Sequence, residues 1–246
     1  MLVSVIVPYF NDELNINKCI NSITNQTYKK FEVIIVDDEN TQKSFNTLKK
    51  LKKKNKVRVI STLRNSGVAF ARNKGIKSSK GKLIAFLDSD DYWKKNKLKE
   101  QVSAFKQNNI DVCYTNYYGI TNKSKIIYKV KSPQQMDYKK FIASCPIACS
   151  SVMLKKSLIK KNKFKNLKTK EDYLLWLELS KKKYKFFGIN KFLTFYRLRK
   201  NSLSRLHTTK FICAFKIYYF YLKFNFFYSL IMVYRLYMNS FLKKYL

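Results

Sequence analysis

The chain has 246 residues, 46% of them hydrophobic, which is enough to bury a full core and excludes global disorder. Its 51 Lys+Arg and 15 Asp+Glu give a formal net charge of +36. This charge indicates a polyanionic partner, or else a solvated lysine surface without one, and both explanations stay open. One histidine and five scattered glycines exclude HExxH zinc sites, P-loops and Rossmann dinucleotide sites.

The first half of the chain alternates between short apolar runs and helical patterns. This alternation predicts an α/β fold with a mostly parallel central sheet flanked by helices. The predicted strands are Val3–Pro8, Phe31–Asp38, Val57–Ser61, Leu83–Asp88 and Val112–Tyr118. The predicted helices are Leu14–Thr24, Thr41–Lys54, Ala69–Ser78 and Lys94–Gln107.

The second half is less regular. It contains candidate strands at Ile126–Val130, Ser150–Leu154 and Phe192–Arg199, and a helical pattern over Glu171–Lys182. After about Ser204 the chain becomes aromatic and basic, and we expect two helices. The expected organisation is therefore a domain at residues 1–204, with halves at 1–120 and 121–204, followed by a helical extension at 205–246.

The cysteines and the N-terminus predict a cytoplasmic protein. The five cysteines form no CxxC pair, as expected for reduced thiols. The first residues, MLVSVIVPYFND, lack a basic n-region and form a first strand better than a signal peptide. No run approaches the roughly 18 apolar residues that a membrane-spanning helix needs.

Acidic residues are scarce in this chain and are clustered. Ten of the 15 fall in four groups: Asp12-Glu13, Asp37-Asp38-Glu39, Asp88/Asp90/Asp91 and Glu171-Asp172. Each of the first three groups follows a predicted strand, and carboxyl ends of parallel strands meet at one edge of a sheet, where ligands bind. Helix capping explains Asp12 and Asp91, but one cap needs only one carboxylate.

The group at Asp88, Asp90 and Asp91 therefore needs another explanation. Like charges about 4 Å apart repel by roughly 4 kcal/mol at an effective dielectric of 20. A divalent cation with oxygen ligands, Mn²⁺ or Mg²⁺, shared with a substrate diphosphate, would neutralise them. The sequence thus predicts a metal seat at the end of the fourth strand.

Four motifs in this order resemble family 2 glycosyltransferases of the GT-A fold. They are VSVIVPYFND, FEVIIVDD, RNSGVAFARNKG and GKLIAFLDSDDYW, and KEDYLLWLEL resembles the family's acceptor-side motif. The likeness is strong over residues 1–120 and moderate over 121–200. It implies that residues 1–120 bind a nucleotide and that a sugar is transferred from a nucleotide-diphosphate donor, usually UDP-linked, to a hydroxyl with inversion.

The resemblance also implies roles for individual residues. Pro8, Tyr9 and Asn11 would border the nucleoside, Asp38 with Asp37 would accept a hydrogen bond from the base, and Arg72 would approach the base or the diphosphate. Asp90 would lie nearest the metal and Asp88 nearer the ribose, together forming the DxD motif. Asp172 would be the catalytic base. The residues that carry these roles are Pro8, Tyr9, Asn11, Asp37, Asp38, Arg72, Asp88, Asp90 and Asp172.

This sequence departs from the family pattern at two places. Glu39-Asn40 replaces the Gly-Ser that often follows the second-strand acids, which puts the conformation of that loop in question. Arg199 stands near the position of a frequent histidine, so any role of that histidine is lost, and Arg197 or Arg199 would be left to neutralise diphosphate charge.

Two other functions compete with glycosyl transfer. A metal-dependent nucleotidyltransferase would share the DxD motif, but it usually has a basic, glycine-rich loop after the first strand, where this chain has YFNDELN. A non-enzymatic nucleic-acid-binding module would explain the charge and the aromatics. Acids gathered at one sheet edge would repel nucleic acid, so we expect none as a partner.

The last part of the chain suggests a membrane or a packing role. From Leu179 to Leu246 there is no acid, while Lys and Arg number 15. Such a segment suits an interfacial helix pair on the anionic inner face of the cell membrane, where a glycan or lipid-linked oligosaccharide acceptor would be found. Helices that pack their aromatics on the domain explain it equally well, and both explanations stay open.

Overall fold

The computed structural model describes residues 1–54, 57–62, 64–198 and 207–242. Its elements follow in chain order: β1 (Val3–Tyr9), α1 (Glu13–Thr24), β2 (Phe31–Asp37), α2 (Gln42–Lys54), β3 (Val57–Ser61), α3 (Val68–Ser78), β4 (Leu83–Phe86), β5 (Tyr92–Trp93), α4 (Lys97–Gln107), β6 (Val112–Ile120), β7 (Ile126–Val130), β8 (Gln135–Met136), α5 (Tyr138–Ala143), η1 (Cys149–Ser151), β9 (Met153–Lys155), α6 (Lys156–Lys161), α7 (Glu171–Lys181), β10 (Phe186–Arg197), α8 (His207–Lys216), η3 (Ile217–Tyr221) and α9 (Phe226–Leu242).

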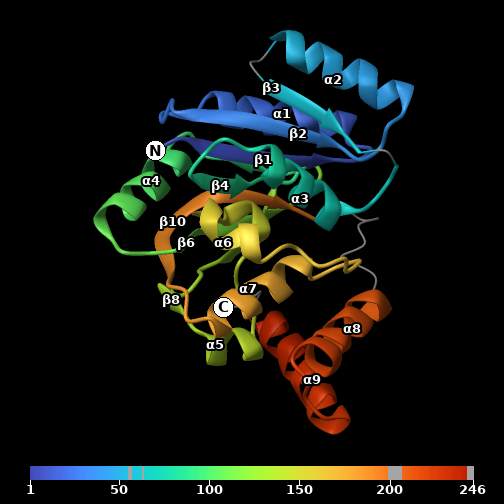
Figure 1. Cartoon of the computed structure of the whole chain (residues 1–246), viewed down its shortest axis with the longest axis vertical. Coiled ribbons are helices and arrows are strands. Elements are labelled where there is room, and N and C mark those ends of the chain that lie inside the picture. The colour runs from blue at the N-terminus through green and yellow to red at the C-terminus, as the bar shows by residue number, and fades with distance from the viewer. Residues whose placement is uncertain (55–56, 63, 199–206, 243–246) are drawn as a thin grey trace.

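One sheet runs through the molecule in the order β3-β2-β1-β4-β9-β6-β10-β5 (Figure 1). The strands β3, β2, β1 and β4 pair in parallel, as expected from the strand–helix alternation. Beyond β4 the sheet becomes mixed, because β9 runs antiparallel to both β4 and β6, while β6 and β10 pair in parallel. The α/β fold with helices on both faces is confirmed.

Alternating side chains of the strands enter two separate cores. On β1, Val5 and Val7 pack in the core under α1, α2 and α4, while Ile6 faces the opposite core with α3 and α7. Both faces of the strand are therefore covered, which is why its sequence is apolar except at Ser4. The two cores hold the sheet between helices and fix the positions of the strand ends.

The expected elements in the first half of the chain are present, with small differences at their ends. Helix α4 begins at Lys97 instead of Lys94, because Tyr92 and Trp93 form β5 against β10 and the Lys94 N–H donates to the Leu193 carbonyl. Strand β4 ends at Phe86, since the Asp88 N–H donates to Ser150 Oγ and not to a neighbouring strand.

The last helices lie at the end of the molecule opposite α2 (Figure 1). Their inner face joins the main core through Ala214, Ile217 and Val233. The Tyr218 hydroxyl donates to the Ile142 carbonyl, so the extension expected at 205–246 packs on the domain. Within the ranges listed above, none of the helices is both long and apolar enough to span a bilayer.

Lys97 is an unusual charged residue in the core under α1, α2 and α4. Its side chain is fully buried on α4, where Nζ donates to Gln101 Oε1 at 2.6 Å and lies 4.0 Å from the centre of the Trp93 ring. Burial lowers the pKa of this ammonium from 10.5 to about 7. The charged form of Lys97 therefore destabilises the folded state.

We expect Lys97→Met to raise the free energy of unfolding at pH 7 by about 1–4 kcal/mol. Between pH 7 and 10.5 the unfolded chain binds this proton more readily than the folded one, so wild-type stability gains with pH and the advantage of Met shrinks. Urea unfolding at pH 7 and pH 10 measures both effects, with Lys99→Met on the exposed face of α4 as control. A less stable Lys97→Met at both pH values would show that the contacts of Lys97 outweigh its burial.

Candidate active site

Acidic residues from the ends of β2 and β4 meet at one edge of the sheet, on either side of β1. Tyr9 at the end of β1 is paired with Asp37 at the end of β2, and β4 is the other neighbour of β1. The backbone continues this pairing past the strands, where the Asp38 N–H donates to the Tyr9 carbonyl and the Leu87 N–H to the Ile6 carbonyl. The structure therefore brings the Asp37-Asp38 and Asp88 groups to the same carboxyl edge.

Asp37 and Asp38 differ in what their carboxylates bind. Asp37 accepts from the N–H groups of Glu39 and Asn40 and from Ser44 Oγ at 2.9 Å, so it organises the start of α2. Asp38 accepts from Thr62 Oγ1 at 2.8 Å, from the Ser66 N–H at 3.0 Å and from the Gly67 N–H at 2.8 Å. Both carboxylates hold loops around the edge, and both are nearly buried.

The loop at Glu39-Asn40 closes without the glycine that the family often has there. Asn40 adopts a positive φ of 56°, a conformation that Asn tolerates better than most residues. Its Nδ2 donates to the Thr62 carbonyl at 2.5 Å. The substitution therefore keeps the two carboxylates in place.

The three acids of the 88–91 turn point to three different surroundings. Asp88 accepts from Arg72 Nη2 at 2.7 Å, and its side chain is 28% exposed. Asp90 is half-buried, and its charge and that of Asp88 add to burial in raising the pKa of Asp91. Asp91 is buried and accepts from the Arg197 N–H at 2.7 Å. The backbone turn thus buries Asp91 and leaves Asp88 and Asp90 at the edge of the sheet.

Arg72 connects Asp88 with the second half of the chain. It lies on α3 with only 3% of its side chain exposed, and its two terminal nitrogens bind Asp88 at 2.7 Å and Glu171 Oε1 at 2.5 Å. The two acids are 83 positions apart in sequence, 88 and 171. A buried, doubly paired guanidinium fixes both carboxylates in one geometry.

Glu171 and Asp172 open α7, and their environments raise the pKa of both. Burial is the main cause for each, partly offset by the nearby Arg72 guanidinium. The Asp88 charge adds to the raised pKa of Asp172, which places the two carboxylates within electrostatic reach of each other. Asp172 is half-buried, and its Oδ1 accepts from the Tyr173 N–H at 2.7 Å. A carboxylate of raised pKa suits proton transfer near neutral pH.

The other predicted residues lie at the same edge in different settings. Pro8 and Tyr9 are buried in β1, and Tyr9 belongs to the core that contains Val5 and Val7, so its side chain lies inside the fold. Asn11 is exposed and its N–H donates to Glu39 Oε2 at 2.8 Å. The Arg197 guanidinium donates to the carbonyls of Asp90, Thr121 and Asn122. Arg199 lies outside the described residues.

One supporting residue, Ser150, escaped the sequence analysis. Ser150 in η1 accepts from the Asp88 N–H through Oγ, and its carbonyl accepts from Trp93 Nε1 at 2.8 Å. Both contacts brace the acidic turn. The only signal was the short SSVML run, which predicts a strand and says nothing of which hydroxyl meets Asp88.

The residues at this edge fit a divalent cation in part. Among the described residues, no group of three or more His, Cys, Asp or Glu side chains is arranged to hold a metal by itself. The carboxylates of Asp88 and Asp90 are hard oxygen donors, and burial together with the charges of Asp90 and Asp88 raises the pKa of Asp91. Two carboxylates with outside oxygens to complete the shell match the way Mg²⁺ usually binds.

Comparison with known proteins agrees with this geometry. Residues 4–167 match the model of glycosyl transferase family 2. The Escherichia coli UDP-Glc:alpha-D-GlcNAc-diphosphoundecaprenol beta-1,3-glucosyltransferase WfgD is 38% identical over 182 residues, 73% of this chain and 70% of its own. The putative teichuronic acid biosynthesis glycosyltransferase TuaG of Bacillus subtilis is 33% identical over 205 residues, 82% and 81%.

Solved structures resemble the fold as a whole. S. aureus TarS 1-349 in complex with UDP-GlcNAc aligns with a TM-score of 0.72 and 22% identity over 95% of this chain and 70% of that one. The mannosyltransferase PcManGT from Pyrobaculum calidifontis, in complex with GDP-Man and Mn²⁺, aligns at 0.71 and 16% identity over 91% and 64%.

Proposed function

The chain belongs to glycosyl transferase family 2, and from this we propose that it moves a sugar with inversion from a nucleotide-diphosphate donor to a lipid-linked glycan. UDP is the proposed nucleotide and cell-surface polysaccharide or lipopolysaccharide the proposed product. Family membership and the GT-A fold set aside the nucleotidyltransferase and nucleic-acid-binding hypotheses. The observation that carries the proposal is the Arg72 bridge, because it joins Asp88 of the DxD motif to Glu171 beside Asp172.

The proposed donor half is residues 1–120 and the proposed acceptor half is 121–204. Asp38 lies where the base of the nucleotide would bind, at the ends of β1 and β2. Its carboxylate already accepts three hydrogen bonds, so it acts on the base together with the loop that it holds. Arg72 binds two acids through its terminal nitrogens, and its proposed role is to position them and to keep the site from excess negative charge.

Asp88 and Asp90 are the proposed holders of Mn²⁺ or Mg²⁺. Such a cation, when bound, stabilises the negative charge that develops on the diphosphate leaving group. Two half-buried carboxylates leave room for oxygens of the donor itself. The support is the donor chemistry and the crowded charge, and the Mn²⁺ of PcManGT belongs to that protein.

Asp172 is the proposed general base. Its carboxylate takes the proton of the acceptor hydroxyl as the hydroxyl oxygen attacks the anomeric carbon and the nucleotide diphosphate leaves. One base on the acceptor side is enough for inversion. Glu171 points into the fold, where it meets Arg72, so the two adjacent acids have separate roles.

A donor screen tests the proposal. The full chain is incubated with a panel of nucleotide sugars and GlcNAc-diphosphoundecaprenol, the acceptor named for the Escherichia coli relatives, with and without Mn²⁺. We expect acceptor-dependent UDP release from one donor or a few, and release roughly 10²–10⁴-fold slower from Asp172→Asn. Release that ignores both the acceptor and Asp172 would point to contaminating hydrolysis and contradict the proposal.

The distal end of the helical pair is the proposed contact with the anionic inner face of the cell membrane. Phe220 in η3 is 53% exposed and Phe227 at the start of α9 is 76% exposed, beside Lys216 and Lys223. Exposed aromatics with adjacent lysines and no acids are typical of interfacial helices. Contact there would bring the enzyme to a lipid-linked acceptor.

We expect Phe220→Ser with Phe227→Ser to lower co-sedimentation with phosphatidylglycerol vesicles, because two aromatic anchors are lost. The thermal midpoint should change little, since both side chains are largely exposed. Phe45→Ser on α2, which is 55% exposed at the other end of the molecule, serves as the matched control. Equal sedimentation of all three proteins would contradict the membrane contact.

A further inference from the structure

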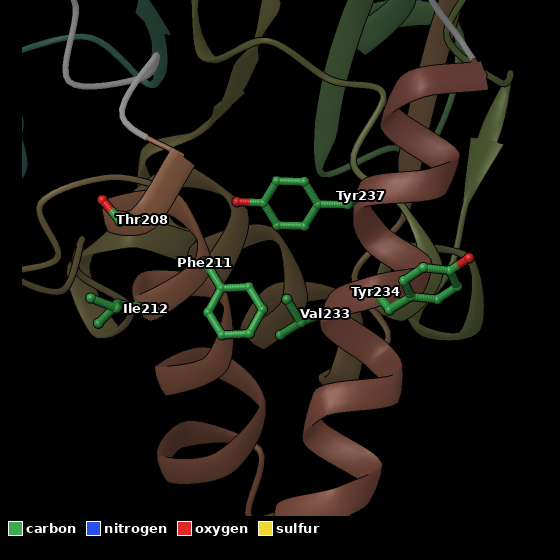
Figure 2. Close-up of a pocket in the computed structure, with 6 residues that line it drawn as sticks. All are labelled: Thr208, Phe211, Ile212, Val233, Tyr234 and Tyr237. Atoms are coloured by element: carbon green, nitrogen blue, oxygen red, sulfur yellow. The ribbon is translucent and has the colours of Figure 1, made fainter.

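An apolar groove runs between α8 and α9 (Figure 2). Its volume is about 540 Å³, within the range of ligand sites. In Figure 2 the Tyr237 ring reaches from α9 across toward α8. The lining side chains are almost entirely hydrocarbon and aromatic: Thr208, Phe211, Ile212, Val233, Tyr234 and Tyr237.

Tyr237, which lines the groove, lies close to Lys170 at the start of α7. The Lys170 ammonium lies 5.9 Å from the centre of the Tyr237 ring and 5.8 Å from that of Tyr173, within cation–π range. Lys170 immediately precedes Glu171 and Asp172. The groove, the ammonium and the proposed base are therefore neighbours in space.

The helical pair is held firmly against this region. The hydroxyls of Tyr173 on α7 and Tyr218 in η3 are 2.8 Å apart, and Tyr218 also donates to the Ile142 carbonyl. Asn239 Nδ2 on α9 donates to the Ala143 carbonyl at 2.9 Å. These contacts fix the distance between the groove and Asp172, as a binding site for part of one substrate requires.

Lys170 is a cationic side chain beside the groove, and burial lowers its pKa while the Asp172 charge raises it. No acid occurs from Leu179 to Leu246. Lys170 has a positive φ of 65°, a conformation that is uncommon outside glycine and that persists only where its surroundings hold it. Its ammonium lies near the rings of both Tyr173 on α7 and Tyr237 in the groove.

We propose that the α8–α9 groove binds the isoprenoid chain of the acceptor lipid and that Lys170 binds the phosphate linking this chain to its sugar. The proposal rests on the proposed transfer to a lipid-linked acceptor. It places chain, phosphate and sugar in a line from the groove through Lys170 to Asp172, in their covalent order in such a lipid. The proposed bilayer contact at Phe220 and Phe227 lies at the other end of the helical pair, so the groove is a separate site.

Photolabelling tests the site without any sugar transfer. The full chain in detergent micelles is mixed with undecaprenyl diphosphate that carries a diazirine in its chain, irradiated and digested, and labelled peptides are identified by mass spectrometry. We expect the label on α8 and α9 around Phe211 and Tyr234. Unlabelled undecaprenyl diphosphate should compete for the site, and phosphatidylglycerol should not.

Matched variants separate the groove from the rest of the tail. Ile212 lines the groove and is 52% exposed, whereas Ile231 on α9 is 58% exposed outside it. Ile212→Asp should reduce labelling about tenfold or more, because a carboxylate is costly beside an apolar chain, and Ile231→Asp should leave it unchanged. Lys170→Gln should weaken competition by undecaprenyl diphosphate and not by undecaprenol.

Each contrary result has a definite meaning. Equal competition by phosphatidylglycerol, or equal loss in Ile231→Asp, would overturn the proposal in favour of general contact with lipid. Label outside the two helices, in a protein that still transfers sugar to GlcNAc-diphosphoundecaprenol, would overturn it and leave the proposed function intact. Label in the groove without transfer to any lipid-linked acceptor would overturn the proposed function alone.

Discussion

Replacing Asp172 with Asn is expected to lower transferase turnover by roughly 10²–10⁴-fold, the usual share of a general base, and to leave donor affinity almost unchanged. The amide keeps the size of the side chain and the acceptor oxygen for the Tyr173 N–H. It removes only the ability to take a proton. The loss should therefore appear in kcat with a confirmed donor and acceptor.

The pH profile of kcat gives a second readout of the same residue. Burial and the Asp88 charge raise the pKa of Asp172 above the ordinary carboxylate range. A base must be ionised to act, so turnover should fall as the pH drops through this raised pKa, at a higher pH than the usual value of about 4. The acid limb should vanish from the residual rate of Asp172→Asn.

Glu171→Gln is the matched control for Asp172→Asn. Gln keeps an oxygen that can accept from Arg72 Nη1, while the charge of the pair is lost. Its effect on turnover should be far smaller, because Glu171 faces Arg72 and not the acceptor. Near-normal turnover in Asp172→Asn, or a larger loss in Glu171→Gln, would mean that the base is assigned to the wrong residue.

The sequence predicted the parallel half of the sheet well because its strands are buried on both faces. A run such as Val3–Pro8 is apolar at every position except Ser4 for that reason, and it ends where polar residues begin. Acids after such runs must meet at one edge, so the neighbourhood of Asp37, Asp38 and Asp88 followed from topology. The sequence thus predicts which residues lie at the carboxyl edge of a parallel sheet.

The contacts across that edge were not predictable in the same way. Arg72 was expected to approach the donor, and the structure has it buried between Asp88 and Glu171. Pairing between α3 and the start of α7 depends on how the second half folds back, which no local pattern encodes. The two-residue strands β5 and β8 also lack a pattern, since two residues show no periodicity.

The tail illustrates a related difficulty with mixed sequences. Its residues are apolar, aromatic and basic all around the helices, so periodicity could not separate a face that packs on the domain from one that meets a lipid. The structure buries Ala214, Ile217 and Val233 and exposes Phe220 and Phe227. The packing explanation is correct for the first face, and the membrane contact is a proposal for the second.

Asp90→Asn is the other change with a large expected effect. We expect wild-type UDP binding to require Mn²⁺ or Mg²⁺. In the presence of the metal, the affinity of the variant for UDP should be about 10²–10³-fold lower than that of the wild type. Asp90 is one of two edge carboxylates, and the second, Asp88, already gives one oxygen to Arg72. Removing the charge of Asp90 therefore leaves the metal seat with one partly committed ligand.

Calorimetry of UDP binding with Mn²⁺ and with EDTA measures this effect. Asp137→Asn is the matched control, because Asp137 is an exposed helix cap on α5 and the change is chemically the same. Undiminished UDP affinity in EDTA would rule out the metal seat. Equal losses in the Asp90 and Asp137 variants would show that the effect is one of net charge and not of coordination.

The charges of the turn provide a check that needs no nucleotide. Asp91 has a raised pKa because it is buried and because Asp90 and Asp88 carry negative charge beside it. Asp90→Asn removes one of these charges, so the pKa of Asp91 should fall in the variant, and Mn²⁺ should lower it in the wild type by the same mechanism. Carboxylate titration followed by NMR would report both shifts. A fall in Asp90→Asn without a response to Mn²⁺ would mean that the acids repel one another but do not share a cation.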